Sequence, residues 1–316
     1  MANVHFILNW LPNVEFAGLW VAEQFGWFRN AGIKMTYKSW APAVHPETDV
    51  PTRGGNTFGL QSGAAIVIAR SKGVPIKALY TDTQKSVFGL TVLADSGINN
   101  LKDLRGKRVG YQGHEYYVPA TMLSCAGLRE TDWKPVQVGF DIVQLTGKRV
   151  DAYLTFVVNE PIALELRGVR QRTFPAANYC FNFYDDVLFT TDSLVKQNPA
   201  LVRKVVGLVA RGFRWAHSHP DAAARLTVRK YFPSSVAGKD IFGRRMSANA
   251  NLVQQIRELR AFTPYSRDAS GRFTGLMNRG TWQSSVNILF KYGQIRSKPR
   301  VVDVYTNRFN PFNPYR

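Results

Sequence analysis

The sequence has few of the residues that build metal and nucleophile sites. Its 316 residues include two cysteines and five histidines, which form no C-x-x-C or H-E-x-x-H spacing, and no serine-nucleophile motif occurs. We therefore expect no metal ion. Cys125 and Cys180 are far apart in sequence, and we expect free thiols in small slots of the core, with a disulfide as the alternative.

Long apolar runs are also missing. No segment approaches the roughly 18 apolar residues of a membrane span. The first residues, "MANVHFILNW", lack the basic start and long apolar run of an export signal. From these features alone, the protein is either cytosolic or has lost an export signal.

Acidic residues are scarce, with 22 Asp and Glu against 41 Lys and Arg, which gives a net charge of +19. The basic residues are spread along the chain, and no nucleic-acid recognition motif accompanies them. The pattern is typical of a positive, soluble exterior, and we expect no nucleic-acid partner. An interaction module for acidic partners remains an alternative to small-molecule binding.

The chain is long enough for two lobes, and its beginning alternates between strand and helix patterns. A Pro- and Gly-rich loop is expected at 42–55. Strands are expected at 5–10, 33–40, 57–60 and 75–81, and helices at 17–32 and 64–73. This alternation predicts an α/β fold with parallel strands.

A second α/β lobe is expected to follow, and the chain then returns to the first. We place the first, discontinuous lobe at 1–90 plus 191–316, with the C-terminal helices, and the second at 91–190. Extended crossings at about 88–93 and 187–191 would form a two-strand hinge. Ligands of open α/β sheets bind beyond the carboxyl ends of strands, so the loops there should line a cleft.

Several segments together resemble a known protein family. They are "LNWLPNVEFAGLWVAEQFGWFRNAGI", "GVPIKALY", "LKDLRGKRVGYQG", "GKRVDAYLTFVVNEP" and "DSLVKQNPALVRKVVGLVARG". They resemble, in the right order from Val4 to Ala222, the solute-binding proteins of the nitrate, sulfonate, taurine and thiamine-pyrimidine group (SsuA/THI5-like). The W-x-P-N corner is similar to the thiamine-precursor and riboflavin branch.

The resemblance implies a type II periplasmic-binding-protein fold with two Rossmann-like lobes that close on a ligand. It also implies an extracytoplasmic monomer, with a removed export signal or lipid anchor, that delivers its solute to an ABC transporter permease. We expect the protein to contact the membrane only through that permease or anchor.

The corner after the first expected strand carries Trp10 and Asn13, where an indole face and an amide could meet a flat heteroaromatic ring. The alternative is that Trp10 packs in the core and Asn13 caps the next helix. Gln61, Ser62 and Gln84 follow later strands, and Ser62 could equally be a helix cap.

The second lobe offers more candidates. "GYQGHEYYVP" supplies His114, Glu115, Tyr116 and Tyr117, a titratable pair beside two aromatic faces.

"FVVNEP" places Asn159 and Glu160 after a strand, where a carboxylate could accept from a ring N–H or amine, or else neutralise the start of its own helix. Tyr184 and Asp185 precede the return crossing. Neighbours on a strand point to opposite faces, so we expect Asp185 or Asp186 to face the ligand and the other to be a surface charge.

Thiamine-pyrimidine synthases resemble the same regions. The resemblance implies that they hold pyridoxal phosphate through a lysine after the strand "FGL", with a histidine four residues later. This chain has Gln61 and Ala65 there, so no imine can form. We therefore expect a binding protein with no cofactor, not an enzyme.

For the solute, we expect a thiamine pyrimidine precursor. Riboflavin, a nitrate, sulfonate or taurine anion, and synthase activity remain alternatives.

Overall fold

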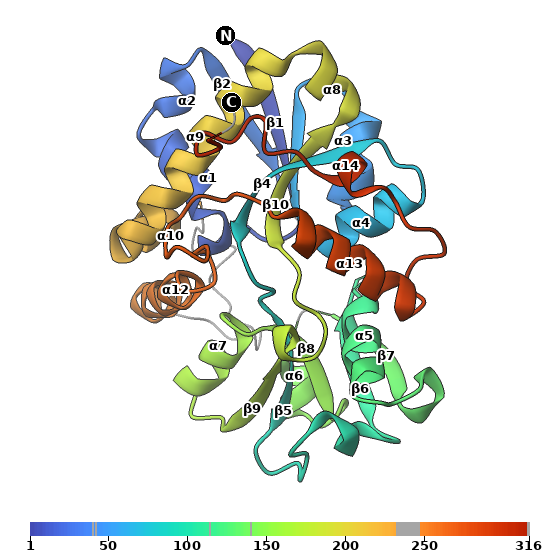
Figure 1. Ribbon diagram of the computed structural model, residues 1–316. Helices are drawn as coiled ribbons and strands as arrows, with labels where there is room; N and C mark the ends of the chain where they lie inside the picture. Colours follow the sequence, from blue (N-terminus) through green and yellow to red (C-terminus); the bar gives the residue numbers. More distant parts are fainter. Residues whose placement is uncertain (40, 42, 114, 140, 232–246, 315–316) are drawn as a thin grey trace.

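Two five-stranded sheets form the centres of two lobes, and the first lobe lies above the second in Figure 1. The computed structural model describes residues 1–39, 41, 43–113, 115–139, 141–231 and 247–314. The first sheet has the order β2-β1-β3-β10-β4, with β1 (Ala2–Leu8), β2 (Ile33–Lys38), β3 (Thr57–Gln61), β4 (Ile76–Thr83) and β10 (Asp185–Thr191). The second has the order β7-β6-β8-β5-β9, with β5 (Phe88–Leu93), β6 (Arg108–Gln112), β7 (Lys134–Val138), β8 (Ala152–Phe156) and β9 (Gln171–Pro175).

Each sheet combines parallel strands with one strand that arrives from the other lobe. β1 pairs in parallel with β2 and β3, and β6 pairs in parallel with β7 and β8. β10 lies antiparallel between β3 and β4, and β5 lies antiparallel between β8 and β9. The α/β fold with two sheet-centred lobes is thereby confirmed.

The expected position of the hinge is wrong in detail. The segments 88–93 and 187–191 are not free crossings, because they form β5 and most of β10 inside the two sheets. The covalent links are instead the shorter stretch 84–87 and the longer stretch 176–184. The lobe boundaries at 90 and 190 stay a prediction.

Helices cover both sheets (Figure 1). They are α1 (Ala17–Gln24), α2 (Trp27–Asn30), α3 (Pro46–Arg53), α4 (Gly63–Ser71), α5 (Tyr117–Cys125), α6 (Val143–Thr146), α7 (Glu160–Leu166), α8 (Asp192–Gln197), α9 (Pro199–Ser218), α10 (Pro220–Lys230), α12 (Ala248–Phe262), α13 (Arg279–Lys291) and α14 (Val301–Val304). Short 3-10 turns are η1 (Val14–Phe16), η2 (Leu101–Leu104), η3 (Glu130–Asp132) and η4 (Ala176–Asn178). Within the described ranges, no helix has both the length and the apolar character that a membrane crossing needs.

Two expectations about helices are wrong. The helix expected at 17–32 is divided into α1 and α2, because Gly26 has a left-handed backbone with φ of 69°. The loop expected at 42–55 contains α3, whose first turn holds Pro46 together with Glu47 and Asp49. Proline at the first helical position and acids in the first turn both stabilise a helix start, which the loop prediction overlooked.

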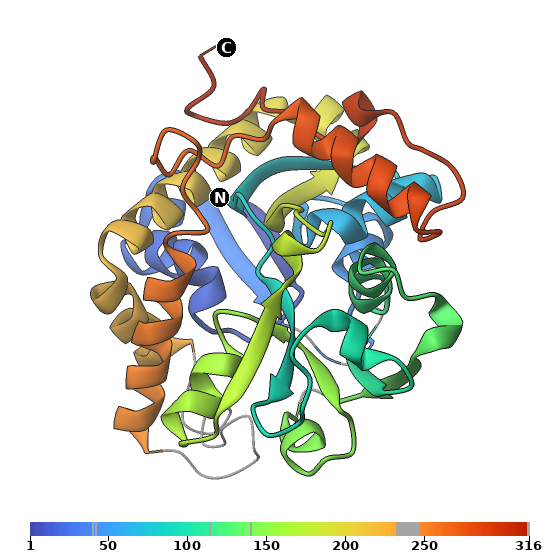
Figure 2. The same cartoon turned by 60° about the horizontal axis from the view of Figure 1, so that its bottom comes forward.

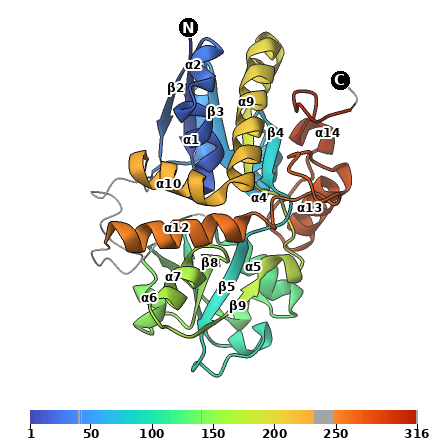
Figure 3. The ribbon, with the colours of Figure 1, turned by 90° about the vertical axis from the view of Figure 1, so that its left-hand side faces the viewer.

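The C-terminal third joins the two lobes from the side. α12 contacts α10 and η1 in the first lobe and α7 in the second. Figure 3 shows α12 lying across the gap between the two sheets, and Figure 2 shows it beside α7 from another direction. The N-terminus lies on the first-lobe side (Figure 1).

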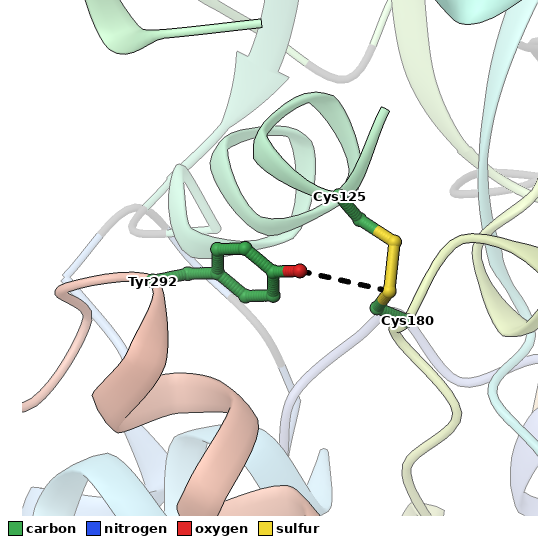
Figure 4. The surroundings of a disulfide bond; sticks show 3 residues. All are labelled: Cys125, Cys180 and Tyr292. Atoms are coloured by element: carbon green, nitrogen blue, oxygen red, sulfur yellow. Dashed lines mark hydrogen bonds between the residues drawn. A yellow bond between two sulfur atoms is a disulfide. The ribbon is translucent and has the colours of Figure 1, made fainter. Parts of the chain in front are cut away.

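The two cysteines form a disulfide, so the expectation of free thiols is wrong. Cys125 ends α5 in the second lobe, and Cys180 lies in the returning link between β9 and β10. The hydroxyl of Tyr292, just after α13, donates a hydrogen bond to the sulfur of Cys180 at 3.7 Å (Figure 4). The fold brings these positions together across 55 residues of sequence, which spacing alone could not show.

Candidate functional site

A cleft lies between the lobes, at the carboxyl ends of the strands, and has two connected compartments. The narrow compartment, about 30 Å³, is lined by Asn9, Trp10, Phe88, Gln112, Glu115, Leu154, Thr155, Phe156, Asn159 and Glu160. The wide compartment, about 290 Å³, is lined by Asn9, Trp10, Val44, His45, Pro46, Glu47, Gln61, Ala65, Gln112, Gly113, Glu115, Tyr117, Gln137, Val138 and Gly139. Four residues line both compartments: Asn9, Trp10, Gln112 and Glu115.

The topology explains why these side chains meet. β1 and β3 end at Leu8 and Gln61 in one sheet, and β6 and β8 end at Gln112 and Phe156 in the other. Parallel strands present their carboxyl ends at one edge of a sheet, and here the two edges face each other. Trp10 therefore stands at the mouth of β1, opposite Glu160 at the start of α7.

A buried hydrogen bond crosses between the lobes at one side of the cleft. The hydroxyls of Ser62 and Tyr117 lie 2.9 Å apart. Ser62 also caps α4 by accepting from the backbone N–H of Ala65. Gln61 lines the wide compartment, and its amide donates to Glu47 at 2.9 Å. Ser62 is thus a helix cap, as the alternative interpretation of the sequence expected, and it also contacts the other lobe, while its contact with a ligand stays a prediction.

Glu115 and Glu160 put two weakly acidic carboxyl groups into the narrow compartment. Burial raises the pKa of Glu115 to about 8, and repulsion from Glu160 and Glu47 adds to this. Burial also raises the pKa of Glu160 to about 7, although backbone N–H groups, including that of Phe156 at 2.8 Å, oppose the shift. A carboxyl group that titrates near neutral pH can either donate or accept a hydrogen bond.

The lining contrasts with the charge of the whole chain. Although the sequence has 41 Lys and Arg, the described residues of both compartments include none of them. Their acidic side chains are Glu47, Glu115 and Glu160, and the histidine among them is His45. The cleft is therefore suited to neutral or cationic solutes that carry hydrogen-bond donors.

Six residues predicted from the sequence come together in this lining: Trp10, Gln61, Glu115, Tyr117, Asn159 and Glu160.

His114 lies outside the described residues. Ser62 is directly behind the lining through its bond to Tyr117. Asn13 is buried and lines neither compartment, and its side chain accepts from the backbone N–H of Glu15 and caps η1. This is the capping role that the sequence left open.

Four further predicted residues have other partners. The Gln84 amide donates to the carbonyl of Leu276, and the Tyr184 hydroxyl accepts from the backbone N–H of Asn278. The Tyr116 hydroxyl donates to Glu130 on the surface of the second lobe. Asp185 accepts from the Ser86 hydroxyl and from the backbone N–H of Val87, so it ties the start of β10 to the link 84–87.

The expectation that Asp185 or Asp186 is a surface charge is wrong. Each has 1% of its surface exposed. The backbone of Asp186 is left-handed, with φ of 52°, so the regular alternation of strand side chains does not hold there.

Sequence reasoning missed Asn9, Glu47 and Gln112. Asn9 directly precedes Trp10, and Gln112 is the last residue of β6. Their positions at the ends of strands could have predicted that they line the cleft. Glu47 was missed as a lining residue because the segment that forms α3 was predicted to be a loop.

Pyridoxal phosphate does not fit the described lining. An imine requires a lysine, and the residue that ends β3 is Gln61. The described residues also contain no group of three or more His, Cys, Asp or Glu placed to hold a metal ion.

Comparison with protein families agrees with this architecture. The model of the family described as "NMT1/THI5 like" matches residues 13–223. The chain belongs to the NMT1/THI5-like family. The match covers the second lobe and the start of the C-terminal helices, and it includes the cleft lining except Asn9 and Trp10, which precede residue 13.

Relatives in this family have different named functions. The chain is 25% identical to the riboflavin-binding protein RibY of Chloroflexus aurantiacus, over 100% of this chain and 88% of RibY. It is 22% identical to the formylaminopyrimidine-binding protein of Halalkalibacterium halodurans, over 92% and 85%. It is 28% identical to a 4-amino-5-hydroxymethyl-2-methylpyrimidine phosphate synthase of Legionella pneumophila, over 71% and 72%.

A solved structure supports the fold. The periplasmic aliphatic sulphonate binding protein SsuA of Escherichia coli aligns with a TM-score of 0.66 at 13% identity, over 96% of this chain and 91% of that one. The type II periplasmic-binding-protein fold expected from the sequence is thus confirmed.

Proposed function

We propose that this protein is the substrate-binding component of an ABC importer and captures a planar N-heteroaromatic solute, a thiamine pyrimidine precursor, between its lobes. The observation that carries the proposal is the placement of the Trp10 indole in one compartment with Glu115 and Glu160, without Lys or Arg in the described lining. An aromatic face contributes stacking, roughly 0.5 to 1.5 kcal/mol beyond burial.

The two carboxyl groups suit the edge of an aminopyrimidine. Such an edge places an amino donor next to a ring-nitrogen acceptor. A protonated carboxyl group matches it, because its O–H donates while its other oxygen accepts. Glu115 and Glu160, whose pKa values are raised to about 8 and about 7, can supply that match near neutral pH.

Domain closure provides the mechanism. A solute that touches Trp10 on the first lobe and Glu160 on the second favours the closed arrangement through its higher affinity for it. The buried hydrogen bond between Ser62 and Tyr117 stabilises the same arrangement. The closed form then presents its solute to the permease.

The same features disfavour the other solutes and the enzyme. A sulfonate, nitrate or taurine sulfonate group would meet buried carboxyl groups and no guanidinium or ammonium partner in the described lining. Synthase activity would need the lysine that Gln61 replaces. We therefore propose a binding protein and not an enzyme.

Riboflavin is the second candidate, favoured by a specific observation. The wide compartment continues from the narrow one past Tyr117, and the relative RibY aligns over the whole chain. A flavin ring also offers an N–H beside a carbonyl.

An extracytoplasmic location is part of this proposal. The disulfide supports it, because disulfides persist in oxidising compartments. We further propose that the protein acts as a monomer and meets the membrane only through its permease or a lipid anchor.

A thermal-shift panel tests the proposal. The panel contains 4-amino-5-hydroxymethyl-2-methylpyrimidine, riboflavin, taurine, nitrate and pyridoxal phosphate. A ligand at about 100 times its Kd adds about 2.7 kcal/mol of stability. We expect the pyrimidine to raise the Tm and the anions to leave it unchanged. A shift with riboflavin alone would select the second candidate, and a shift with taurine or nitrate alone would overturn both.

A further inference from the structure

Two buried carboxyl groups lie behind the cleft and line neither of its compartments. Glu15 lies in η1 and Asp186 in β10, with 2% and 1% of their surfaces exposed. Among the described residues, no N–H or hydroxyl group donates to either carboxyl oxygen of Asp186. The Glu15 carboxyl lies within hydrogen-bonding reach of Asp186, so a proton on Glu15 can satisfy one of these oxygens.

The surroundings favour one shared proton on this pair. The charged groups that act on the two residues, Glu115, Asp185 and Asp82, are all acids. Burial and repulsion from Asp186 raise the pKa of Glu15, and burial also raises the pKa of Asp186 to about 7. The two carboxyl groups therefore share one proton more readily than they hold two negative charges.

Asn9 connects this pair to the cleft. It lines both compartments, and its side-chain amide hydrogen-bonds to the carboxyl of Glu15. Because that bond favours the ionised form of Glu15, Asn9 is the donor. Its other side-chain atom, Oδ1, is buried and has no hydrogen-bond partner among the described residues. A buried amide oxygen without a partner beside a ligand cavity is an acceptor that the protein itself leaves unused.

The backbone of Asp186 also has an energetically unfavourable conformation. Asp186 is one of three described non-glycine residues with a left-handed backbone, together with Lys148 and Cys180. Such a conformation is uncommon outside glycine, and it adds to the cost of burying a carboxylate. Two unfavourable features in one residue next to the cleft are typical of a functional position.

We propose that Glu15 shares a proton with Asp186 and accepts from the Asn9 amide, and thereby holds Asn9 Oδ1 toward the cleft to select solutes with an N–H donor. Glu15 and Asp186 are positioning residues, and Asn9 is the residue that touches the solute. This inference rests on the proposed function and narrows the solute class to heteroaromatic rings with an amino or imide N–H on the edge that faces the first lobe.

Substitutions at Glu15 separate positioning from simple packing. Glu15→Gln keeps both bonds, because the new amide can donate to Asp186 and accept from Asn9. Glu15→Leu keeps the approximate size and removes both. We expect Glu15→Gln to bind within about twofold of the native protein, and Glu15→Leu and Asn9→Leu to lose about tenfold or more, since each leaves a polar partner unpaired.

Calorimetry with matched solutes gives the readout. The probes are 4-amino-5-hydroxymethyl-2-methylpyrimidine and riboflavin, and their blocked counterparts are the 4-dimethylamino analogue and 3-methylriboflavin. The native protein should bind the parent solute more tightly than the blocked one, and Asn9→Leu should reduce this preference. Equal preference in the two proteins, with both folded by circular dichroism, would overturn the inference and leave the proposed function intact. If neither parent solute binds the native protein, the proposed function fails.

An infrared difference spectrum tests the acid pair without any solute. At pH 7, the spectrum of native protein minus Glu15→Gln should show the C=O band of a protonated carboxyl group. Absence of that band would contradict the shared proton, whatever the calorimetry shows.

Discussion

The hydroxyl oxygens of Ser62 and Tyr117 lie 2.9 Å apart and form a buried hydrogen bond from the first lobe to the second. Ser62 caps α4, and Tyr117 begins α5, so the bond joins the ends of two helices that flank the cleft. A contact of this kind exists only while the lobes are together. It therefore ties the affinity for a solute to the stability of the closed form.

Tyr117→Phe should weaken solute binding without damaging the fold. The ring and its stacking on Phe181 remain, while the Ser62 hydroxyl loses its partner. A net hydrogen bond contributes about 1 kcal/mol, so we expect a loss of roughly fivefold in affinity for the pyrimidine by calorimetry. Tyr116→Phe is the matched control, because that hydroxyl bonds on the surface of the same lobe. Equal effects of the two substitutions would argue against the contact between the lobes.

Stability should fall as the pH rises from about 5 to about 8. Glu115, Glu160 and Glu258 have folded pKa values of about 8, 7 and 8, above their ordinary values. In this window the folded state holds protons that the unfolded state has released, so each group contributes a slope of up to roughly 1 kcal/mol per pH unit. Acids with lowered pKa values, such as Asp151, lose their stabilising effect only at lower pH.

Urea denaturation at about pH 5.5 and about pH 8 measures this slope. The double variant Glu115→Gln, Glu160→Gln should show a smaller difference between the two conditions, because neither amide titrates. Asp151→Asn serves as the control, since its carboxylate is paired with Arg108 and ionised throughout. A native protein that becomes more stable toward pH 8 would contradict the raised pKa values.

Reduction of the disulfide should destabilise the protein. Cys125 and Cys180 close a loop with a sequence separation of 55, for which the chain-entropy model gives roughly 4 kcal/mol. Urea denaturation with and without dithiothreitol measures the loss. The Cys125→Ser, Cys180→Ser variant should be insensitive to the reductant. Two titratable thiols in the denatured, unreduced native protein would show that the bond is absent.

Two glycines in α9 should respond in opposite ways to alanine. A Cβ at Gly212 would lie 2.0 Å from the carbonyl oxygen of Gly18 in α1, whereas a Cβ at Gly207 would meet nothing within 4 Å. We expect Gly212→Ala to cost about 1 to 3 kcal/mol or more, since two packed helices must separate. Gly207→Ala should be neutral or add up to about 1 kcal/mol. Thermal unfolding of both variants checks the expectation, and a tolerated Gly212→Ala would contradict the close crossing of α1 and α9.

The sequence predicted the fold well where the apolar pattern, the turn residues and the helix caps are close together in the chain. β1, β3 and α4 occur close to their expected places because an apolar run, a turn residue and a helix cap follow one another in the chain. The break at Gly26 and the helix α3 were missed, because an aromatic-rich periodic stretch hid the first and prolines hid the second.

The site was predictable at strand ends and unpredictable where it depends on distant contacts. Trp10 and Glu160 were found because both follow strands of a recognised pattern. One of Asp185 and Asp186 was taken as a surface charge although both are buried, because the position of Asp186 near Glu15 depends on residues far apart in the sequence. The pairing of Cys125 with Cys180 likewise depends on how the returning link lies against α5.

Isothermal titration of 4-amino-5-hydroxymethyl-2-methylpyrimidine into the native protein and into Trp10→Ala tests the central claim most directly. We predict one site per chain with a Kd on the order of micromolar or tighter in the native protein, and a loss of about tenfold or more in a folded Trp10→Ala variant. Equal affinity in the two proteins would contradict a heteroaromatic solute held against Trp10 in the cleft.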